Sequence, residues 1–147
     1  MAIRNIVKEG DPILRKVSRS ILNFDNKLAV LLDDMAQTMY NADGCGLAGP
    51  QVGMLRRVCV VDVGEGIIEL VNPAVIKQEG VQHENEGCLS LPGKSGVTER
   101  PMKVTVKAQD RNGNTFEISG EGLLARALCH EIDHLNGILY TDKLFKE

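Results

Sequence analysis

Two histidines four residues apart, with a glutamate directly after the first, are the residues of this chain best spaced for metal chemistry. They lie in His130-Glu131-Ile132-Asp133-His134. At about 100° per residue on a helix, the two imidazoles lie within roughly 40° of each other, so both can bind one ion. Glu131 lies roughly 60° to the other side of His134. A carboxylate there is better placed to take a proton from metal-bound water than to bind the metal itself.

The alternative interpretation of this segment is a surface helix that carries two solvated histidines and a glutamate. The surrounding residues predict a helix that ends at Asn136-Gly137, and its apolar residues form one arc. These residues are Leu123, Leu124, Ala127, Leu128, Ile132 and Leu135. The two histidines lie at one edge of the arc, and Glu131 lies within it. Because an unpaired buried carboxylate is costly, a nearby cation is the better explanation.

A catalytic metal takes three protein ligands and keeps one position for water or substrate, so the chain must supply another donor. Cys88 is the best placed, because a glycine before it and a proline soon after it let a thiolate face a cleft. Cys45 and His83 remain possible. Cys129 is expected on the polar face of the helix. Cys59 lies in an apolar strand, where we expect a small, buried hydrophobic side chain.

Length and composition limit the classes of protein to which the chain can belong. Its 147 residues suit one domain, 1–147, with a single core. A net charge of -3 and 3% aromatic residues argue against a nucleic-acid groove. No apolar run approaches the roughly 18 residues of a membrane helix, and the N-terminus lacks a secretory signal. We therefore expect a cytoplasmic protein without a membrane span, whose four cysteines are thiols or metal ligands.

The remaining patterns predict the elements that position these residues. A helix capped by Asp25 and stopped at Asp43-Gly44 carries leucine and methionine at helical spacing. Strands are expected at 57–62, 67–71, 73–77, 103–108 and 115–118, the last two as a hairpin. Residues 140–147 leave room for a short strand or a frayed tail. The order predicts an α+β fold, in which antiparallel sheets pack around a central, metal-binding C-terminal helix, with a second long helix near the N-terminus.

A glycine-rich segment joins the first helix to the first strand. Residues 44–53 hold four glycines and a proline, which exclude regular structure. Glycines let a ligand approach main-chain NH and CO groups, and the amide of Gln51 can donate and accept hydrogen bonds. A tight connecting turn is an equally good interpretation of this segment taken alone.

Three segments together resemble the signature motifs of the peptide deformylases. They are Gly44-Cys45-Gly46-Leu47-Ala48-Gly49-Pro50-Gln51, Glu86-Gly87-Cys88-Leu89-Ser90 and His130-Glu131-Ile132-Asp133-His134. The order and approximate spacing match, and the resemblance spans nearly the whole chain, including residues 10–15. An ordered set of three motifs is highly specific.

The resemblance implies a role for each matching residue. Cys88, His130 and His134 hold the metal, and Glu131 is the general base and acid. Gln51 and the backbone NH of Leu89 stabilise the oxyanion, while Gly46, Gly87 and Arg100 bind substrate. These roles are carried over by motif position and not from spacing.

The implied reaction is removal of the N-formyl group from N-formylmethionyl nascent peptides, with release of formate. Metal-bound water attacks the formyl carbonyl, and Glu131 delivers the proton to the leaving amine. A thiolate and two imidazoles suit zinc or ferrous iron, and the resemblance favours Fe(2+), with Zn(2+), Ni(2+) or Co(2+) as substitutes. A transient contact with the ribosome surface is the other implied partnership.

Two residues depart from the family pattern. Cys45 stands where a larger aliphatic residue is usual, and Gly49 stands where alanine is usual, so the pocket mouth is expected to be roomier. Many members also add a C-terminal helix that helps ribosome docking, so docking here needs another surface.

Two other functions stay open at this stage. A zinc peptidase of the His-Glu-x-x-His type usually takes His or Glu as its third ligand. A binding module with a structural or redox-sensing metal site would close its fourth position with a protein ligand such as Cys45.

Overall fold

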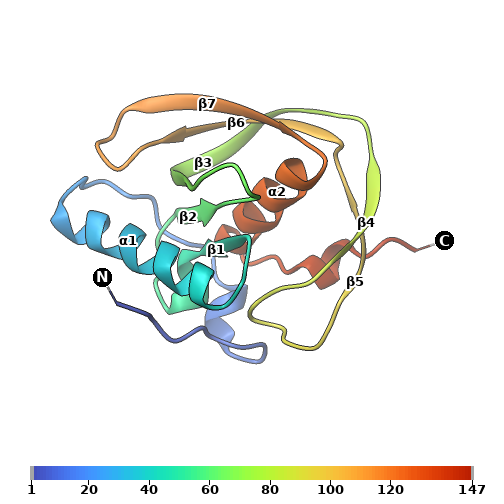
Figure 1. Cartoon of the computed structure of the whole chain (residues 1–147), viewed down its shortest axis with the longest axis horizontal. Helices are drawn as coiled ribbons and strands as arrows, with labels where there is room; N and C mark the ends of the chain where they lie inside the picture. Colours follow the sequence, from blue (N-terminus) through green and yellow to red (C-terminus); the bar gives the residue numbers. More distant parts are fainter. Residues whose placement is uncertain (1, 147) are drawn as a thin grey trace.

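Helix α2 (Leu123–Leu135) lies at the centre of the fold, with sheets on two of its sides (Figure 1). The computed structural model describes residues 2–146. A five-stranded antiparallel sheet has the order β1-β2-β3-β6-β7, and a separate two-stranded antiparallel sheet joins β4 to β5. The α+β fold with two helices and antiparallel sheets is therefore confirmed.

The strands are short except for the third. In the larger sheet they are β1 (Gly46–Ala48), β2 (Val58–Val61), β3 (Ile68–Glu79), β6 (Lys103–Gln109) and β7 (Thr115–Glu121). The smaller sheet comprises β4 (Gln82–Glu86) and β5 (Gly96–Arg100). Within residues 2–146 there are also three short 3-10 helices: η1 (Pro12–Arg15) before the first strand, η2 (Gly49–Val52) between β1 and β2, and η3 (Tyr140–Lys143) after α2. The absence of regular structure expected for residues 44–53 is therefore wrong, since β1 and η2 lie in this segment.

Alternate residues of the central strands pack on opposite helices. Cys59 and Val61 of β2 join the core that contains α2, whereas Val58 and Val60 join the core that contains α1 (Asn26–Asn41). This alternation follows from the two-residue period of a strand. All four side chains are fully buried, so β2 is sandwiched between the two helices.

Helix α1 begins and ends close to the predicted positions. The Asp25 side chain accepts a hydrogen bond from the backbone N of Leu28 at 3.1 Å, which caps the first turn. Helix α2 ends at the predicted Asn136-Gly137, and Gly137 has φ +74. A Cβ at Gly137 would lie 2.5 Å from the Arg15 carbonyl oxygen, so glycine is required there.

Two predicted boundaries are wrong. Residues 68–79 form one strand, β3, where two strands at 67–71 and 73–77 were predicted. Its pairing with β6 shifts register between Val71 and Ala74, where Pro73 has no N–H to donate, and continues beyond it. Residues 140–143 form the 3-10 helix η3, which the pair of Arg15 with Asp142 anchors, and the short strand expected there is reduced to one antiparallel bridge between Leu144 and Thr98.

The polar face expected on α2 is narrower than predicted: Arg126 and Asp133 are half-buried and Asn136 is exposed, but Ala125 and Cys129 do not belong to that face. Cys129 is only 8% exposed and Ala125 is fully buried, and both pack in the core beneath the large sheet. Helix α2 is thus covered on nearly all sides. Among residues 2–146, no helix is long and apolar enough to cross a membrane.

Replacing Leu128 by alanine tests the central position of α2. Leu128 is fully buried against the large sheet, so L128A should lower the free energy of unfolding by about 2–5 kcal/mol in urea denaturation. V30A on α1 is the control, because Val30 is 44% exposed and its loss should cost less than about 1 kcal/mol. Equal losses in the two variants would contradict the packing described.

Candidate metal centre

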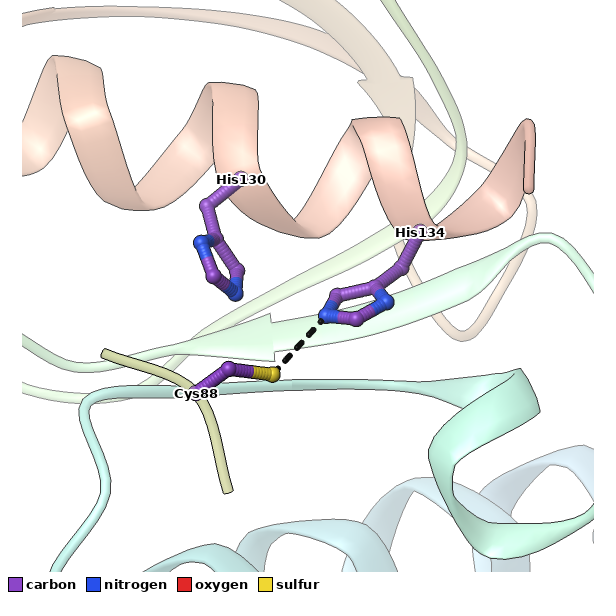
Figure 2. Close-up of side chains that lie close together, drawn as sticks. All are labelled: Cys88, His130 and His134. Atoms are coloured by element: carbon purple, nitrogen blue, oxygen red, sulfur yellow. Dashed lines mark hydrogen bonds between the residues drawn. The ribbon is translucent and has the colours of Figure 1, made fainter. Parts of the chain in front are cut away.

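Cys88, His130 and His134 converge on one point between α2 and the loop after β4. Their ligand atoms all lie within 4.8 Å of one another, and Cys88 Sγ is 3.4 Å from His134 Nε2. Figure 2 shows both imidazoles projecting from the same side of the helix toward the thiol. Ligands of a tetrahedral ion lie about 3.5 Å apart, so this group fits a single metal ion.

The charges around the group also fit a cation. Burial lowers the pKa of His130, but Glu131, Cys88 and Glu86 outweigh it and raise that pKa well above its usual value. Burial lowers the pKa of His134 well below its usual value, which keeps this imidazole neutral. The site therefore favours one positive charge beside its carboxylates and a neutral imidazole as a ligand. A divalent cation with a Cys/His/His donor set meets both conditions.

Glu86 fixes the orientation of His130. Its Oε1 lies 2.8 Å from His130 Nδ1, which leaves Nε2 of this imidazole to face the thiol. Arg100 donates to both oxygens of Glu86, each at 3.0 Å, and Thr98 also donates to this carboxylate. Burial raises the pKa of Glu86, but the bonds from His130 and Arg100 outweigh it and lower that pKa to about 2. Glu86 is therefore a permanent anion behind the histidine.

Gln51 holds the loop that carries the thiol. Its Nε2 donates to Ser90 Oγ at 3.1 Å and lies 3.5 Å from Cys88 Sγ. Its Oε1 accepts from the backbone N of Ala48 at 2.9 Å, and the side chain is 1% exposed. The amide is thus fixed between β1 and the loop after β4 that carries Cys88 and Ser90.

Glu131 lies against the backbone of Gly46. A Cβ at Gly46 would lie 2.3 Å from Glu131 Oε2, so only glycine leaves room for this carboxylate. Glu131 is 4% exposed, and its Oε1 has no hydrogen-bond partner within the described chain. Burial raises the pKa of Glu131 to about 7, with a smaller opposing effect from His130. An unpaired buried carboxyl group that titrates near neutrality can exchange protons with a bound molecule.

A cavity of about 330 Å³ opens beside these groups. The glycine-rich segment lines one side, residues 85–89 line a second, and α2 lines the third with residues that include Leu123 and Arg126. His130 and Glu131 face it from deeper in the helix. The cavity therefore combines apolar side chains such as Leu89 and Leu123 with a few polar groups and a reactive base, as a small-molecule or peptide site usually does.

The structure places most of the residues expected from the sequence around this cavity. Residues at the cavity wall are Gly46, Gln51, Gly87, Cys88, Leu89, His130 and Glu131, and His134 is the buried third member of the ligand group. Cys45 lies at the rim, outside the ligand group, and His83 pairs with Glu99 on β5 instead.

Arg100 does not line the cavity. Its guanidinium is buried between Glu86 and Asp133, to both of which it donates hydrogen bonds. Sequence reasoning assigned no part to Glu86 or Asp133, and their places within the two motifs were the only available signals. Tyr140 was also missed; its ring stacks on that of His130 at a centroid distance of 6.1 Å.

Comparison with known proteins gives one consistent family. The family model described as "Polypeptide deformylase" matches residues 3–147. The peptide deformylase of Alkaliphilus metalliredigens is 61% identical over 147 residues, which cover all of both chains. The crystal structure of the peptide deformylase from Thermotoga maritima superposes with a TM-score of 0.97 at 39% identity, covering 99% of this chain and 100% of that one. The enzyme from Legionella pneumophila gives a TM-score of 0.95 at 48% identity, over 98% and 87% of the two chains.

Replacing Glu86 by glutamine tests whether this carboxylate orients the imidazole of His130. E86Q keeps the size of the side chain but removes the charge that orients the imidazole, so the affinity for a divalent metal should fall about 10- to 100-fold. Competition with a chromogenic chelator measures this affinity. E84Q is the matched control on the same strand, because Glu84 is exposed and lies outside the cavity. An unchanged affinity in E86Q would show that Glu86 does not orient the ligand.

Proposed function

Because the chain belongs to the polypeptide deformylase family, and acts as a peptide deformylase, we propose a role for each residue of its metal centre. The observation that supports the proposal best is a Cys/His/His ligand group with Glu131 beside it on the wall of one cavity. The enzyme is a metal-dependent hydrolase. We further propose that residues 1–147 act as a single catalytic domain.

We propose Fe(2+) as the resident metal, held by Cys88, His130 and His134. The thiolate and two imidazoles are a donor set that ferrous iron accepts, and Zn(2+), Ni(2+) or Co(2+) are chemically reasonable substitutes. When bound, the ion supplies Lewis acidity, which polarises the formyl carbonyl and lowers the pKa of water.

Glu131 is the proposed general base and acid. Its unpaired Oε1 can accept the proton of the attacking water, and the same carboxyl group can return that proton to the leaving amine. A pKa raised by burial to about 7 suits a group that must do both near neutral pH. The adjacent backbone of Gly46 keeps the carboxylate in place.

Gln51 and the backbone NH of Leu89 are the proposed donors to the developing oxyanion. Gln51 Nε2 lies close to Cys88 Sγ, and Leu89 is the next residue in the chain, so both can face the reacting carbonyl. Donors fixed in advance need not reorganise during the reaction. The hydrogen bond of Gln51 Oε1 to β1 supplies that rigidity.

Gly46 and Gly87 are proposed to pair with the substrate backbone from opposite sides of the cavity. Gly46 begins β1, the edge strand of the large sheet, and Gly87 directly follows β4. Arg100 was expected to bind substrate, but we propose a different part for it. Its bonds to Glu86 and Asp133 make it a positioning residue that acts through His130.

The proposed substrates are N-formylmethionyl nascent peptides, which yield formate and a free amino terminus. The bacterial peptide deformylases among the relatives support this proposal. We also propose that the enzyme works in the cytoplasm and contacts the ribosome surface only transiently.

Formate release from formyl-Met-Ala-Ser tests the reaction and the part of Glu131 in it. Protein loaded anaerobically with Fe(2+) should release formate, and E131Q should lower kcat about 10²- to 10⁴-fold because general acid–base catalysis is lost. Metal content by mass spectrometry should stay near one ion per chain. E117Q, which alters an exposed carboxylate of β7, should keep full activity. Normal turnover by E131Q would overturn the proposed mechanism.

Replacing Cys88 by serine separates this enzyme from a zinc peptidase with another third ligand. C88S should lose more metal affinity than E86Q, because it removes one of the three ligands themselves. C45S should keep its metal, since Cys45 lies outside the ligand group. Retention of metal by C88S would favour the peptidase, and loss of metal by C45S would favour a closed structural site.

A further inference from the structure

Three exposed apolar side chains lie beyond the mouth of the cavity. Val81 is 58% exposed, Met102 is 42% exposed and Leu123 is 47% exposed. We refer to these three residues as the distal apolar patch. Val81 and Met102 come from the connections between β3 and β4 and between β5 and β6, and Leu123 is the first residue of α2, directly after its connection to β7.

Hydrogen bonds hold these three connections together. The backbone N of Gly122 donates to the Met102 carbonyl at 2.9 Å. Gln82 Nε2 donates to the carbonyls of Pro101 and Gly122, each at 2.9 Å. The three connections run close together at one end of α2 (Figure 1). The distal apolar patch is therefore a fixed part of the surface.

The patch is continuous with the cavity. Leu123 belongs to both, since it also lines the cavity wall. Arg126, another wall residue, donates to Gln82 Oε1 at 2.8 Å, so the cavity wall and the base of the patch share a hydrogen bond. A peptide that leaves the cavity past Leu123 meets the patch next.

The free edge of β4 indicates the direction in which such a peptide runs and the number of its residues that reach the patch. Within residues 2–146, β4 pairs only with β5, so its other edge can accept an added strand. A peptide whose formyl end lies at Cys88 and which pairs with this edge runs from Glu86 back toward Gln82. Gln82 is five residues before Gly87, or about 17 Å at about 3.3 Å per residue, so a peptide whose formylmethionine pairs with Gly87 places its residues four to five positions later beside His83 and Gln82.

We propose that Val81, Met102 and Leu123 form a distal subsite for apolar side chains that follow formylmethionine by about four to five residues in the same substrate. The inference rests on the proposed function, because it takes the cavity as the site of the formylmethionine. It assigns a substrate preference, for chains with apolar residues near their N-termini, to surface residues that take no part in the chemistry. The preference should act on binding, because these residues lie away from the reacting atoms.

Two formylated hexapeptides test the distal subsite. Formyl-Met-Ala-Ser-Ser-Leu-Leu places leucine at the proposed distance, and formyl-Met-Ala-Ser-Ser-Ser-Ser does not. With Fe(2+)-loaded protein, kcat/KM should be about fivefold higher for the leucine peptide, through a lower KM, because part of two apolar side chains leaves water. The double variant V81S/M102S should bring the ratio of the two peptides close to one.

The control is the double variant V17S/L22S. Val17 and Leu22 are 65% and 84% exposed on the N-terminal segment, so this variant makes a similar chemical change away from the cavity. It should keep the fivefold ratio. Equal kcat/KM for both peptides in the unmodified protein, or an unchanged ratio in V81S/M102S, would overturn the distal subsite.

A binding measurement separates this inference from the proposed function. In zinc-loaded protein with 13C-labelled methionine methyl groups, the product Met-Ala-Ser-Ser-Leu-Leu should shift the Met102 signal, and Met-Ala-Ser-Ser-Ser-Ser should not. If formyl-Met-Ala-Ser is cleaved but neither peptide moves this signal, only the distal subsite fails. If formyl-Met-Ala-Ser is not cleaved, the proposed function itself fails. A Met102 signal that shifts only with protein concentration would assign the patch to a second copy of the chain and overturn the subsite.

Discussion

The buried carboxylate of Glu86 is the interaction on which the metal centre depends. It accepts hydrogen bonds from Arg100 and Thr98 and lies against His130, so one anion joins β4, β5 and α2. Removing a single partner from such a buried network leaves another charge unpaired, which costs far more than a surface ion pair contributes. The thiol of Cys88 follows Glu86 by two residues, so the same anion also fixes the distance between the ligand loop and the helix.

The fold explains how so many polar groups can lie inside so small a protein. Helix α2 is covered on nearly all sides, so its metal-binding residues face a partly closed interior and not bulk water. In such surroundings electrostatic effects are stronger, and the same burial that makes the carboxyl group of Glu131 hard to ionise brings its pKa close to neutrality. The two cores on either side of β2 keep the helix and the glycine-rich segment in register.

The sequence was most informative where chemistry imposes a spacing. Two histidines and a glutamate on one helix predicted the ligand pair and the adjacent carboxylate, and the apolar arc placed Glu131 in the interior, where it lies. The ribbon of β4 and β5 could not be predicted, because its strands are rich in charged and polar residues that are typical of loops. Contacts of Glu86 and Arg100 with α2 stabilise this ribbon. Arg100 donates to Asp133, which is distant in the chain, so no local pattern indicates the contact. Likewise, β3 looked like two strands because Pro73 breaks the local pattern, whereas pairing across the sheet resumes beyond it.

The division of the ligands between two elements has a thermodynamic consequence. Cys88 and His134 are 46 residues apart in sequence and belong to different layers of the fold. An ion bound to both acts as a reversible cross-link, which removes loop-closure entropy from the unfolded chain much as a disulfide does. The thermal midpoint of the protein is then linked to the free metal concentration, so the cell's supply of the ion governs how long the folded enzyme persists as well as how fast it turns over.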